Sequence, residues 1–142
     1  MKTQIIEVRT GSREGVFDLT GECQNFVAEA TRPGAETSNS DGLLHVFVPH
    51  ATAGLAVMEL GASSDRDLLA VLAEVLPADD RWQHAHGSRG HGRSHVLPAF
   101  LPPYATIPVV DGRLALGTWQ SIALVDLNVD NHVRQVRLSF FS

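Results

Sequence analysis

The chain has 142 residues, of which 44% are hydrophobic and 19% charged, a balance typical of one globular domain rather than of a disordered segment. The net charge of -5 at pH 7 argues against a general nucleic-acid binder, because such proteins need a basic face. No apolar run approaches the roughly 20 residues that span a bilayer, and the single cysteine cannot form an internal disulfide, so we expect a cytoplasmic protein with no membrane contact.

The N-terminal part of the chain predicts two strands and a helix. Residues 5–9 alternate apolar and polar side chains, as a half-buried strand does, and residues 15–19 predict a second strand. Thr20 is placed to cap a helix, because apolar residues then recur at helical spacing. These apolar residues are Cys23, Phe26, Val27 and Ala30.

The middle of the chain predicts a buried strand, an extended segment and a second helix. Residues 43–48 are almost wholly apolar, which is typical of a central strand, and residues 55–60 resume an extended pattern. Ser63 or Ser64 is expected to cap a helix whose apolar stripe runs over residues 68–76.

The C-terminal part is predicted to be mainly β-structure. Residues 96–101 indicate a short helical turn, residues 105–110 a strand, and Asp111-Gly112 a two-residue hairpin turn. Further strand patterns follow at residues 114–116, 118–127 and 132–140. The whole predicts one α+β domain over residues 1–142, a mixed, mostly antiparallel β-sheet sandwich with two main helices.

Common catalytic templates are absent from the sequence, which has no Walker A segment, H-E-x-x-H pair or G-x-S-x-G elbow. Residues 77–95 have little periodicity, and a loop of this length is usually functional or disordered. Four of the seven histidines lie within twelve residues of this segment: His84, His86, His91 and His95. A spacing of two suits a strand and a spacing of four a helix, so two hypotheses stay open, a metal or anion site and a solvated histidine-rich loop.

His50 has a more specific local context. It follows the predicted central strand and precedes four small residues, 51–54, which let a ligand approach the backbone, and Thr52 offers a hydroxyl. The alternative is a histidine whose hydrogen bonds are satisfied at the end of a strand. Glu59 follows in the next extended segment and, taken alone, is most often a surface carboxylate.

Trp119 stands between Thr118 and Gln120, directly after a glycine. One interpretation is a sheet residue packed in the core. The other is an aromatic wall of a pocket whose hydroxyl and amide neighbours fix the orientation of a ligand.

Three blocks of the sequence resemble the YjbQ-like family, known as secondary thiamine-phosphate synthases. Residues 114–120, Leu-Ala-Leu-Gly-Thr-Trp-Gln, preceded by Ile-Pro and Asp-Gly-Arg, are similar to its signature. Residues 50–55, followed by Glu59, are similar to its His-Thr-Ser-Ala-x-Leu block. His84 and His95 match the spacing of its two loop histidines. Asn residues flank the glutamate in the family but Met58 and Leu60 do so here, so no role of those asparagines carries over.

The resemblance implies a homotrimer of small α+β domains with a histidine-lined cleft near a subunit boundary. It also implies an enzyme that joins a pyrimidine pyrophosphate to a thiazole phosphate with loss of pyrophosphate. The alternatives are a non-catalytic metal- or metabolite-binding homotrimer and a trimer whose histidines only support packing. His86 and His91 have no counterpart in the family pattern and are expected on the surface or behind the ligands.

On this hypothesis one divalent metal ion, zinc or magnesium, is held by His50, His84 and His95. Glu59 completes the catalytic set as a base or as the acceptor that fixes a histidine tautomer. The expected contacts to a phosphorylated substrate are Thr52, Arg113, Thr118, Trp119 and Gln120. Without a metal, protonated imidazoles and Arg113 would hold the anion, with Arg89 and Arg93 adding positive charge. The central expectation is that the three imidazoles meet in one cavity beside the indole of Trp119.

Overall fold

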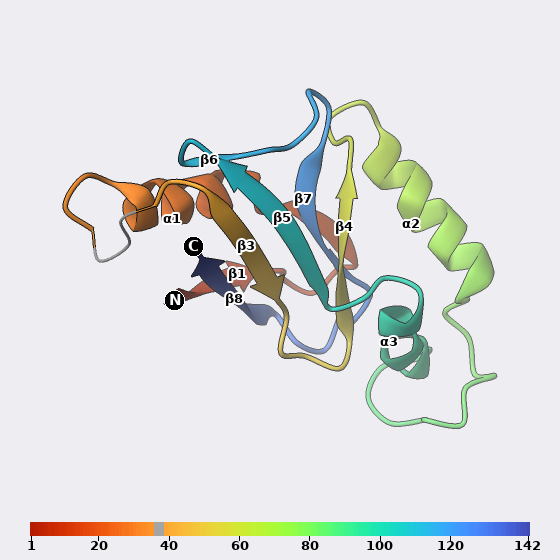
Figure 1. Ribbon diagram of the computed structural model, residues 1–142. Coiled ribbons are helices and arrows are strands. Elements are labelled where there is room, and N and C mark those ends of the chain that lie inside the picture. The colour runs from red at the N-terminus through yellow and green to blue at the C-terminus, as the bar shows by residue number, and fades with distance from the viewer. Residues whose placement is uncertain (36–38) are drawn as a thin grey trace.

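The computed structural model describes residues 1–35 and 39–142. Its strands are β1 (Lys2–Arg9), β2 (Gly15–Asp18), β3 (Gly42–Phe47), β4 (Ala53–Met58), β5 (Tyr104–Val110), β6 (Arg113–Leu114), β7 (Ser121–Asp126) and β8 (Val133–Phe141). Its helices are α1 (Thr20–Thr31), α2 (Ser64–Val75) and α3 (Gly92–Val96), and a 3-10 turn, Leu97–Ala99, follows α3. These elements form a five-stranded sheet of order β1-β8-β3-β5-β6 and a three-stranded sheet of order β2-β7-β4 (Figure 1). Every strand pair of the described residues is antiparallel, and the α+β prediction with two main helices is confirmed.

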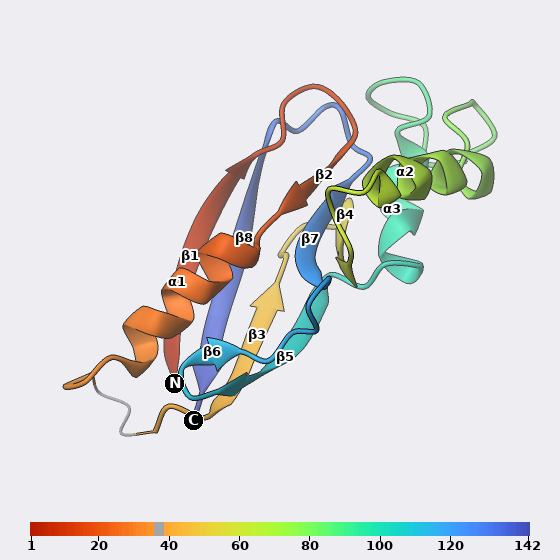
Figure 2. The ribbon, with the colours of Figure 1, turned by 90° about the horizontal axis from the view of Figure 1, so that it is seen from above.

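Alternation along the strands separates a buried from an open face of the five-stranded sheet. On β8, Val136 and Leu138 are fully buried, while Arg137 between them is exposed. The buried face packs with α1 and the three-stranded sheet into the main core, and Figure 2 shows α1 lying along β1 and β8. The residues that α1 buries are those predicted from their spacing, Cys23, Phe26, Val27 and Ala30.

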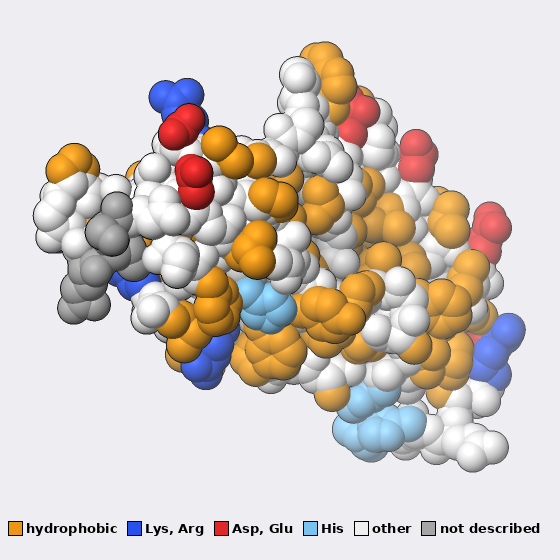
Figure 3. Space-filling model, in the orientation of Figure 1, with side chains coloured by type: hydrophobic (Ala, Val, Ile, Leu, Met, Phe, Trp, Pro, Cys, Tyr) orange, Lys and Arg blue, Asp and Glu red, His pale blue; other side chains and the backbone are white. Residues whose placement is uncertain are grey.

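No element of the described residues covers the opposite face of this sheet in Figure 3, where hydrophobic side chains gather over β3 and β5. The strand register places the odd-numbered residues of β3 on this face with the even-numbered residues of β5. The large apolar residues exposed on it are Ile5, Leu43, Tyr104, Val110 and Phe141, each at least 44% exposed.

A second, smaller core fixes the segment between α2 and α3 against β7. It consists of Leu72, Leu76, Leu97, Val125 and Leu127. Trp82 packs against this cluster, and its indole N–H donates to the carbonyl of Pro77 at 2.9 Å. The histidine-rich segment therefore begins at an anchored residue. Within the described residues, no helix is both long and apolar enough to cross a membrane.

One predicted helix cap differs from the observed one, and the other holds its position without a side-chain hydrogen bond. Leu19 holds the N-cap position of α1, and Thr20 lies inside the helix, where its hydroxyl donates to Asp18 at 2.6 Å and accepts from the backbone N–H of Ile122 at 2.9 Å. Ser63 does hold the N-cap position of α2, but in the left-handed region at φ 69°, and its side chain makes no capping hydrogen bond.

The β6–β7 connection contains less strand than predicted. The strand expected over 118–127 begins at Ser121, because residues 117–120 form a turn. In that turn the backbone N–H of Gln120 donates to the Gly117 carbonyl at 3.0 Å, and the Gln120 side-chain oxygen accepts from the Gly117 N–H at 2.8 Å. The strand expected over 114–116 is reduced to Arg113–Leu114. The hairpin turn at Asp111-Gly112 is confirmed, with φ of 50° and 71° at these two residues.

Candidate metal centre

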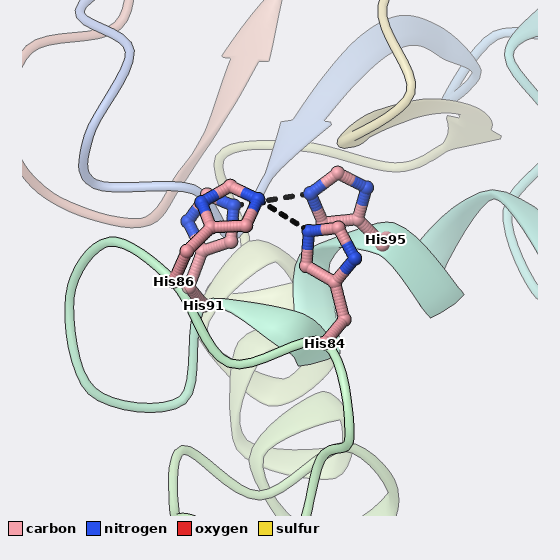
Figure 4. Close-up of side chains that lie close together, drawn as sticks. All are labelled: His84, His86, His91 and His95. Carbon is pink, nitrogen blue, oxygen red and sulfur yellow. Dashed lines mark hydrogen bonds between the residues drawn. The ribbon is translucent and has the colours of Figure 1, made fainter.

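Four imidazole rings converge at the end of the molecule where α3 begins (Figure 4). They belong to His84, His86, His91 and His95, and one ring nitrogen of each lies within 4.8 Å of the others. The prediction that His84 and His95 come together is confirmed. His86 and His91, which the sequence placed on the surface or behind the ligands, contribute ring nitrogens to the same group.

The closest contacts in the cluster join ring nitrogens. The Nε2 atoms of His84 and His86 are 2.6 Å apart, and those of His91 and His95 are 3.0 Å apart. The ring centroids of His84 and His95 are 4.0 Å apart. Each short nitrogen pair requires a proton on one partner and a lone pair on the other.

The local fold explains how residues at unlike spacings meet. His91 holds the N-cap position of α3 with helical backbone angles, and His95 follows four residues later, so both rings lie on one helical face. Gly92 is buried, and a Cβ there would come within 2.5 Å of the His84 carbonyl oxygen and of the Trp82 side chain. Because Gly92 has no side chain, the loop backbone at His84 can lie against α3.

A carboxylate outside the loop holds one of the rings. Asp130, on the β7–β8 connection, accepts a hydrogen bond from His91 Nδ1 at 2.7 Å. The same oxygen accepts from the backbone N–H and the hydroxyl of Ser88, at 3.1 and 2.9 Å. The Ser88 backbone hydrogen bond, followed by that of His91, lowers the pKa of the Asp130 carboxyl below its ordinary 3.8.

Electrostatics favours the neutral form of His95. Burial is the largest cause that lowers the pKa of His95 below 6.5, and the neighbouring charges of His84, His91 and His86 add to it. The side chain of His91 is only 8% exposed. A neutral imidazole offers a lone pair to a metal ion, whereas a protonated one cannot.

The arginines of this segment serve different purposes. Arg93 is buried, donates to the Leu76 carbonyl at 3.0 Å and pairs with Glu14, so it ties α3 to α2 and to the β1–β2 turn. The expectation that Arg93 adds positive charge for a substrate is wrong, because a carboxylate already neutralises it. Arg89 is 73% exposed and lies 3.5 Å from Asp80.

A small cavity adjoins the cluster. Its volume is about 140 Å³, and its walls include Trp82, His84, Arg89 and His91. Two carboxylates, Asp79 and Asp80, also line it, so its charge is mixed rather than uniformly positive.

His50 lies in a different environment from the four clustered rings. Its Nε2 accepts the backbone N–H of Gln135 at 2.9 Å, which leaves the proton on Nδ1. Burial lowers its pKa, the charge of Arg134 lowers it further and that of Asp126 opposes the shift. Thr52 is buried nearby in the chain, at the start of β4. The metal-ligand role predicted for His50, with His84 and His95, stays a prediction; among the described residues, the histidines whose ring nitrogens lie close to those of His84 and His95 are His86 and His91.

Another group of predicted residues lies at the far end of the three-stranded sheet. His50 precedes β4 and Glu59 follows it, and a six-residue strand at about 3.3 Å per residue separates its ends by about 20 Å. Met58 pairs with Ser121, so Glu59 lies at the same end as Trp119 and its neighbours. Trp119 is 73% exposed, and Thr118 and Gln120 are exposed beside it.

Within one chain, the expected cavity of three imidazoles beside the indole is therefore wrong. Trp119 is not a core residue, so the interpretation that it packs in the core is excluded within one chain. The interpretation that it forms an aromatic wall of a pocket stays a prediction. Arg113 is exposed on β6, near α1 and away from α3 in Figure 1. The chemical roles expected of Arg113, Glu59 and the residues around Trp119 stay predictions.

The fold and the histidine site together define a class: an α+β domain of two antiparallel sheets whose long loop carries clustered imidazoles. The family model described as "UPF0047 protein YjbQ-like" matches residues 4–142. The UPF0047 protein Rv2556c of Mycobacterium tuberculosis is 53% identical over 140 residues, which cover 99% of this chain and 98% of that protein. The chain therefore belongs to the YjbQ-like UPF0047 family.

More distant relatives agree with this assignment. The UPF0047 protein YugU of Bacillus subtilis is 30% identical over 121 residues, which cover 82% of this chain and 83% of that protein. The crystal structure of the hypothetical protein APE1520 from Aeropyrum pernix K1 matches with a TM-score of 0.86 and 30% identity, covering 100% of this chain and 99% of that one. The family and the fold expected from the sequence blocks are both confirmed.

Proposed function

We propose that this protein binds one divalent transition-metal ion through the four clustered histidines. The observation that carries the proposal is the convergence of four ring nitrogens within 4.8 Å. In a tetrahedral zinc site with bonds of 2.0–2.1 Å, the ligand nitrogens lie about 3.3 Å apart. His84 and His86 are exposed, so their rings have room to rotate toward that spacing.

The donor set favours zinc over magnesium, the two ions that the sequence left open. All four donors are imidazole nitrogens, which suit zinc, copper, nickel and iron. Magnesium prefers oxygen ligands in octahedral geometry and keeps several waters. The Asp130 carboxylate hydrogen-bonds His91, an arrangement in which a carboxylate makes a ligating imidazole more basic.

We extend the proposal to a small phosphorylated substrate, on the strength of the family resemblance. In the implied reaction, a carbon–oxygen bond to pyrophosphate breaks and a carbon–nitrogen bond to the thiazole forms. A bound metal supplies Lewis-acid stabilisation of the charge that develops on the leaving pyrophosphate. From this chain, Arg89 lines the 140 Å³ cavity, and its exposed pair with Asp80 would have to open for it to reach a phosphate oxygen.

A non-catalytic metal- or metabolite-binding homotrimer is the second candidate. The observation that favours it is the number of ligands, since structural zinc sites use four protein ligands and catalytic ones keep a position open. The two candidates differ in turnover. Zinc-loaded protein incubated with the two thiamine precursors and Mg²⁺ forms thiamine phosphate only under the first.

The homotrimer belongs to both candidates, and the open face of the five-stranded sheet supports it. Contiguous exposed apolar surface of this kind is typical of a protein–protein contact. Leu43 and Tyr104 are 47% and 53% exposed there. Within one chain, Trp119 and His50 lie at opposite ends of β4 and β7. In a trimer, Trp119 of one chain could instead approach His50 of a neighbouring chain.

The metal proposal is tested with dialysed protein reloaded with Zn²⁺. We expect one equivalent of tightly held zinc per chain, and loss of that equivalent in the His84→Ala/His95→Ala double variant. His132→Ala removes an exposed histidine outside the cluster and serves as the matched control. His50→Ala is expected to keep its zinc. Zinc retained by the double variant, or absent from the unaltered chain, contradicts the proposal.

The assembly is tested by light scattering of the protein in solution. We expect three chains per particle, and dissociation in Tyr104→Glu, because a charge on the apolar face opposes its burial. Val71→Glu, which adds the same charge at a residue 55% exposed on α2, is the control and is expected to stay trimeric. If the unaltered protein is a monomer, the trimer is refuted and the metal-binding proposal is unaffected.

A further inference from the structure

The strongest unexplained feature beside the cluster is a carboxylate that the sequence motifs do not mark. Asp130 Oδ2 accepts hydrogen bonds from His91 Nδ1 and from both the backbone and the hydroxyl of Ser88. Three donors on one oxygen fix that oxygen with respect to the loop. The side chain is 36% exposed, so water competes with these contacts only in part.

Asp130 is itself held from the core. Its backbone N–H donates to the Asn128 side chain at 2.7 Å, and the Asn128 N–H donates to Asp126 at 2.9 Å. Asp126 is fully buried and forms two hydrogen bonds with the guanidinium of Arg134. Asp126, Asn128 and Asp130 thus form a chain of hydrogen bonds that links the buried ion pair to the histidine cluster.

The hydrogen bond to Asp130 decides which nitrogen of His91 is free. Because Nδ1 donates its proton to the carboxylate, the neutral ring keeps a lone pair on Nε2. That Nε2 is the atom 3.0 Å from His95 Nε2, inside the cluster. The contact therefore orients the ring and selects the tautomer that a metal ion requires.

The loop shows an independent adaptation to this contact. A Cβ at Gly87 would lie 2.7 Å from Asp130 Oδ2 and 2.9 Å from His91 Nδ1, and Gly87 has a φ of +74°. A side chain at this position would require the Asp130 carboxylate or the His91 ring to move. The absence of a side chain at Gly87 therefore leaves the room that the Asp130–His91 contact occupies.

We propose that Asp130 is a positioning residue of the metal site, which presents Nε2 of His91 to the ion and anchors the loop through Ser88. This inference rests on the proposed metal binding. On this proposal, Asp130 on the β7–β8 connection orients His91, a ligand that belongs to a different loop. Metal affinity then depends on a residue that never touches the ion.

The test measures zinc affinity by competition with a chromophoric chelator, for the full chain at pH 7.5. Asp130→Ala is expected to weaken zinc binding by about 10- to 100-fold, the range found when such carboxylate partners are removed. Asp130→Asn keeps an acceptor oxygen and is expected to recover part of the affinity. Ser88→Ala, a milder change, removes one anchor and is expected to cost less than Asp130→Ala. Asp111→Asn, in the β5–β6 turn, is the matched control and is expected to bind as the unaltered chain does.

A second readout separates positioning from folding. Cobalt-substituted protein reports the coordination number through its visible absorption, so loss of His91 from the ion changes the spectrum of Asp130→Ala even when the protein is fully folded. Urea unfolding of the metal-free forms checks the fold. Asp130→Ala with unchanged zinc affinity and an unchanged cobalt spectrum overturns the inference and leaves metal binding intact. An unaltered chain that binds no zinc overturns both.

Discussion

Removing the guanidinium of Arg134 is expected to destabilise the protein and to change the titration of His50. Arg134 and Asp126 are 1% and 0% exposed, and they form two hydrogen bonds, Nε to Oδ2 at 2.7 Å and Nη2 to Oδ1 at 2.9 Å. In Arg134→Met the buried carboxylate keeps the Asn128 N–H as its hydrogen-bond donor. Leaving one partner of a buried pair uncompensated costs about 3–5 kcal/mol.

The size of that loss sets the expected measurement. An unfolding entropy of about 2.1 cal/mol/K per residue gives about 0.3 kcal/mol/K for a chain of this length, so the melting temperature falls by about 10–17 °C. In urea, the free energy of unfolding of Arg134→Met falls by about 3–5 kcal/mol. The Asp126→Leu/Arg134→Met double variant leaves no unpaired charge and is expected to be more stable than either single variant.

The same variant has a local readout. Arg134 lowers the pKa of His50 and Asp126 raises it, so Arg134→Met is expected to raise the pKa of His50 in an NMR titration. A loss of less than about 1 kcal/mol, the size of an exposed ion pair, would refute the assignment of a buried pair. So would a double variant whose destabilisation equals the sum of the two single ones, because the residues would then not be coupled.

Three further predictions concern single residues. His50 has a pKa below 6.5 in the folded protein, so its contribution to stability is present above pH 6.5 and is lost as the pH falls through the lower folded pKa. Metal-free His50→Gln should therefore lose less unfolding free energy than the unaltered chain between pH 7.5 and 5.5. Equal losses in the two proteins would contradict this. Burial, followed by the charges of Glu22 and Asp18, raises the pKa of Cys23 to about 12, so the thiol should react with Ellman's reagent at pH 8 only after denaturation, and fast labelling of the native protein would contradict its burial. Gly92→Ala places a Cβ 2.5 Å from the His84 carbonyl and should lower zinc affinity, whereas Gly21→Ala, in open space on α1, should leave it unchanged.

Elements governed by local periodicity were predictable from the sequence. The α1 face follows from the helical spacing of Cys23, Phe26, Val27 and Ala30, and the β5–β6 hairpin follows from Asp111-Gly112. The cap of α1 was less predictable, because the Thr20 hydroxyl accepts a hydrogen bond from β7 rather than capping the helix. Its preference for a cap is outweighed by a tertiary hydrogen bond.

The site was predictable only in part. The density of histidines in residues 84–95 signalled a cluster, but the spacings fit no single element, because the loop turns at glycines of positive φ and then enters a helix. His86 and His91 could have been included by treating all four rings as equivalent. Asp130 could not, because no motif links it to a loop about forty residues earlier. The family blocks around His50 and Trp119 identify residues typical of the family. They do not indicate whether those residues lie close together within one chain.

X-ray absorption at the zinc edge of the zinc-loaded protein tests the four-histidine centre most directly. We predict four nitrogen neighbours at about 2.0–2.1 Å, with the outer-ring scattering that imidazoles produce. A zinc ion surrounded by oxygen atoms, or bound by fewer than four imidazoles, would contradict the assignment of His84, His86, His91 and His95 as its ligands.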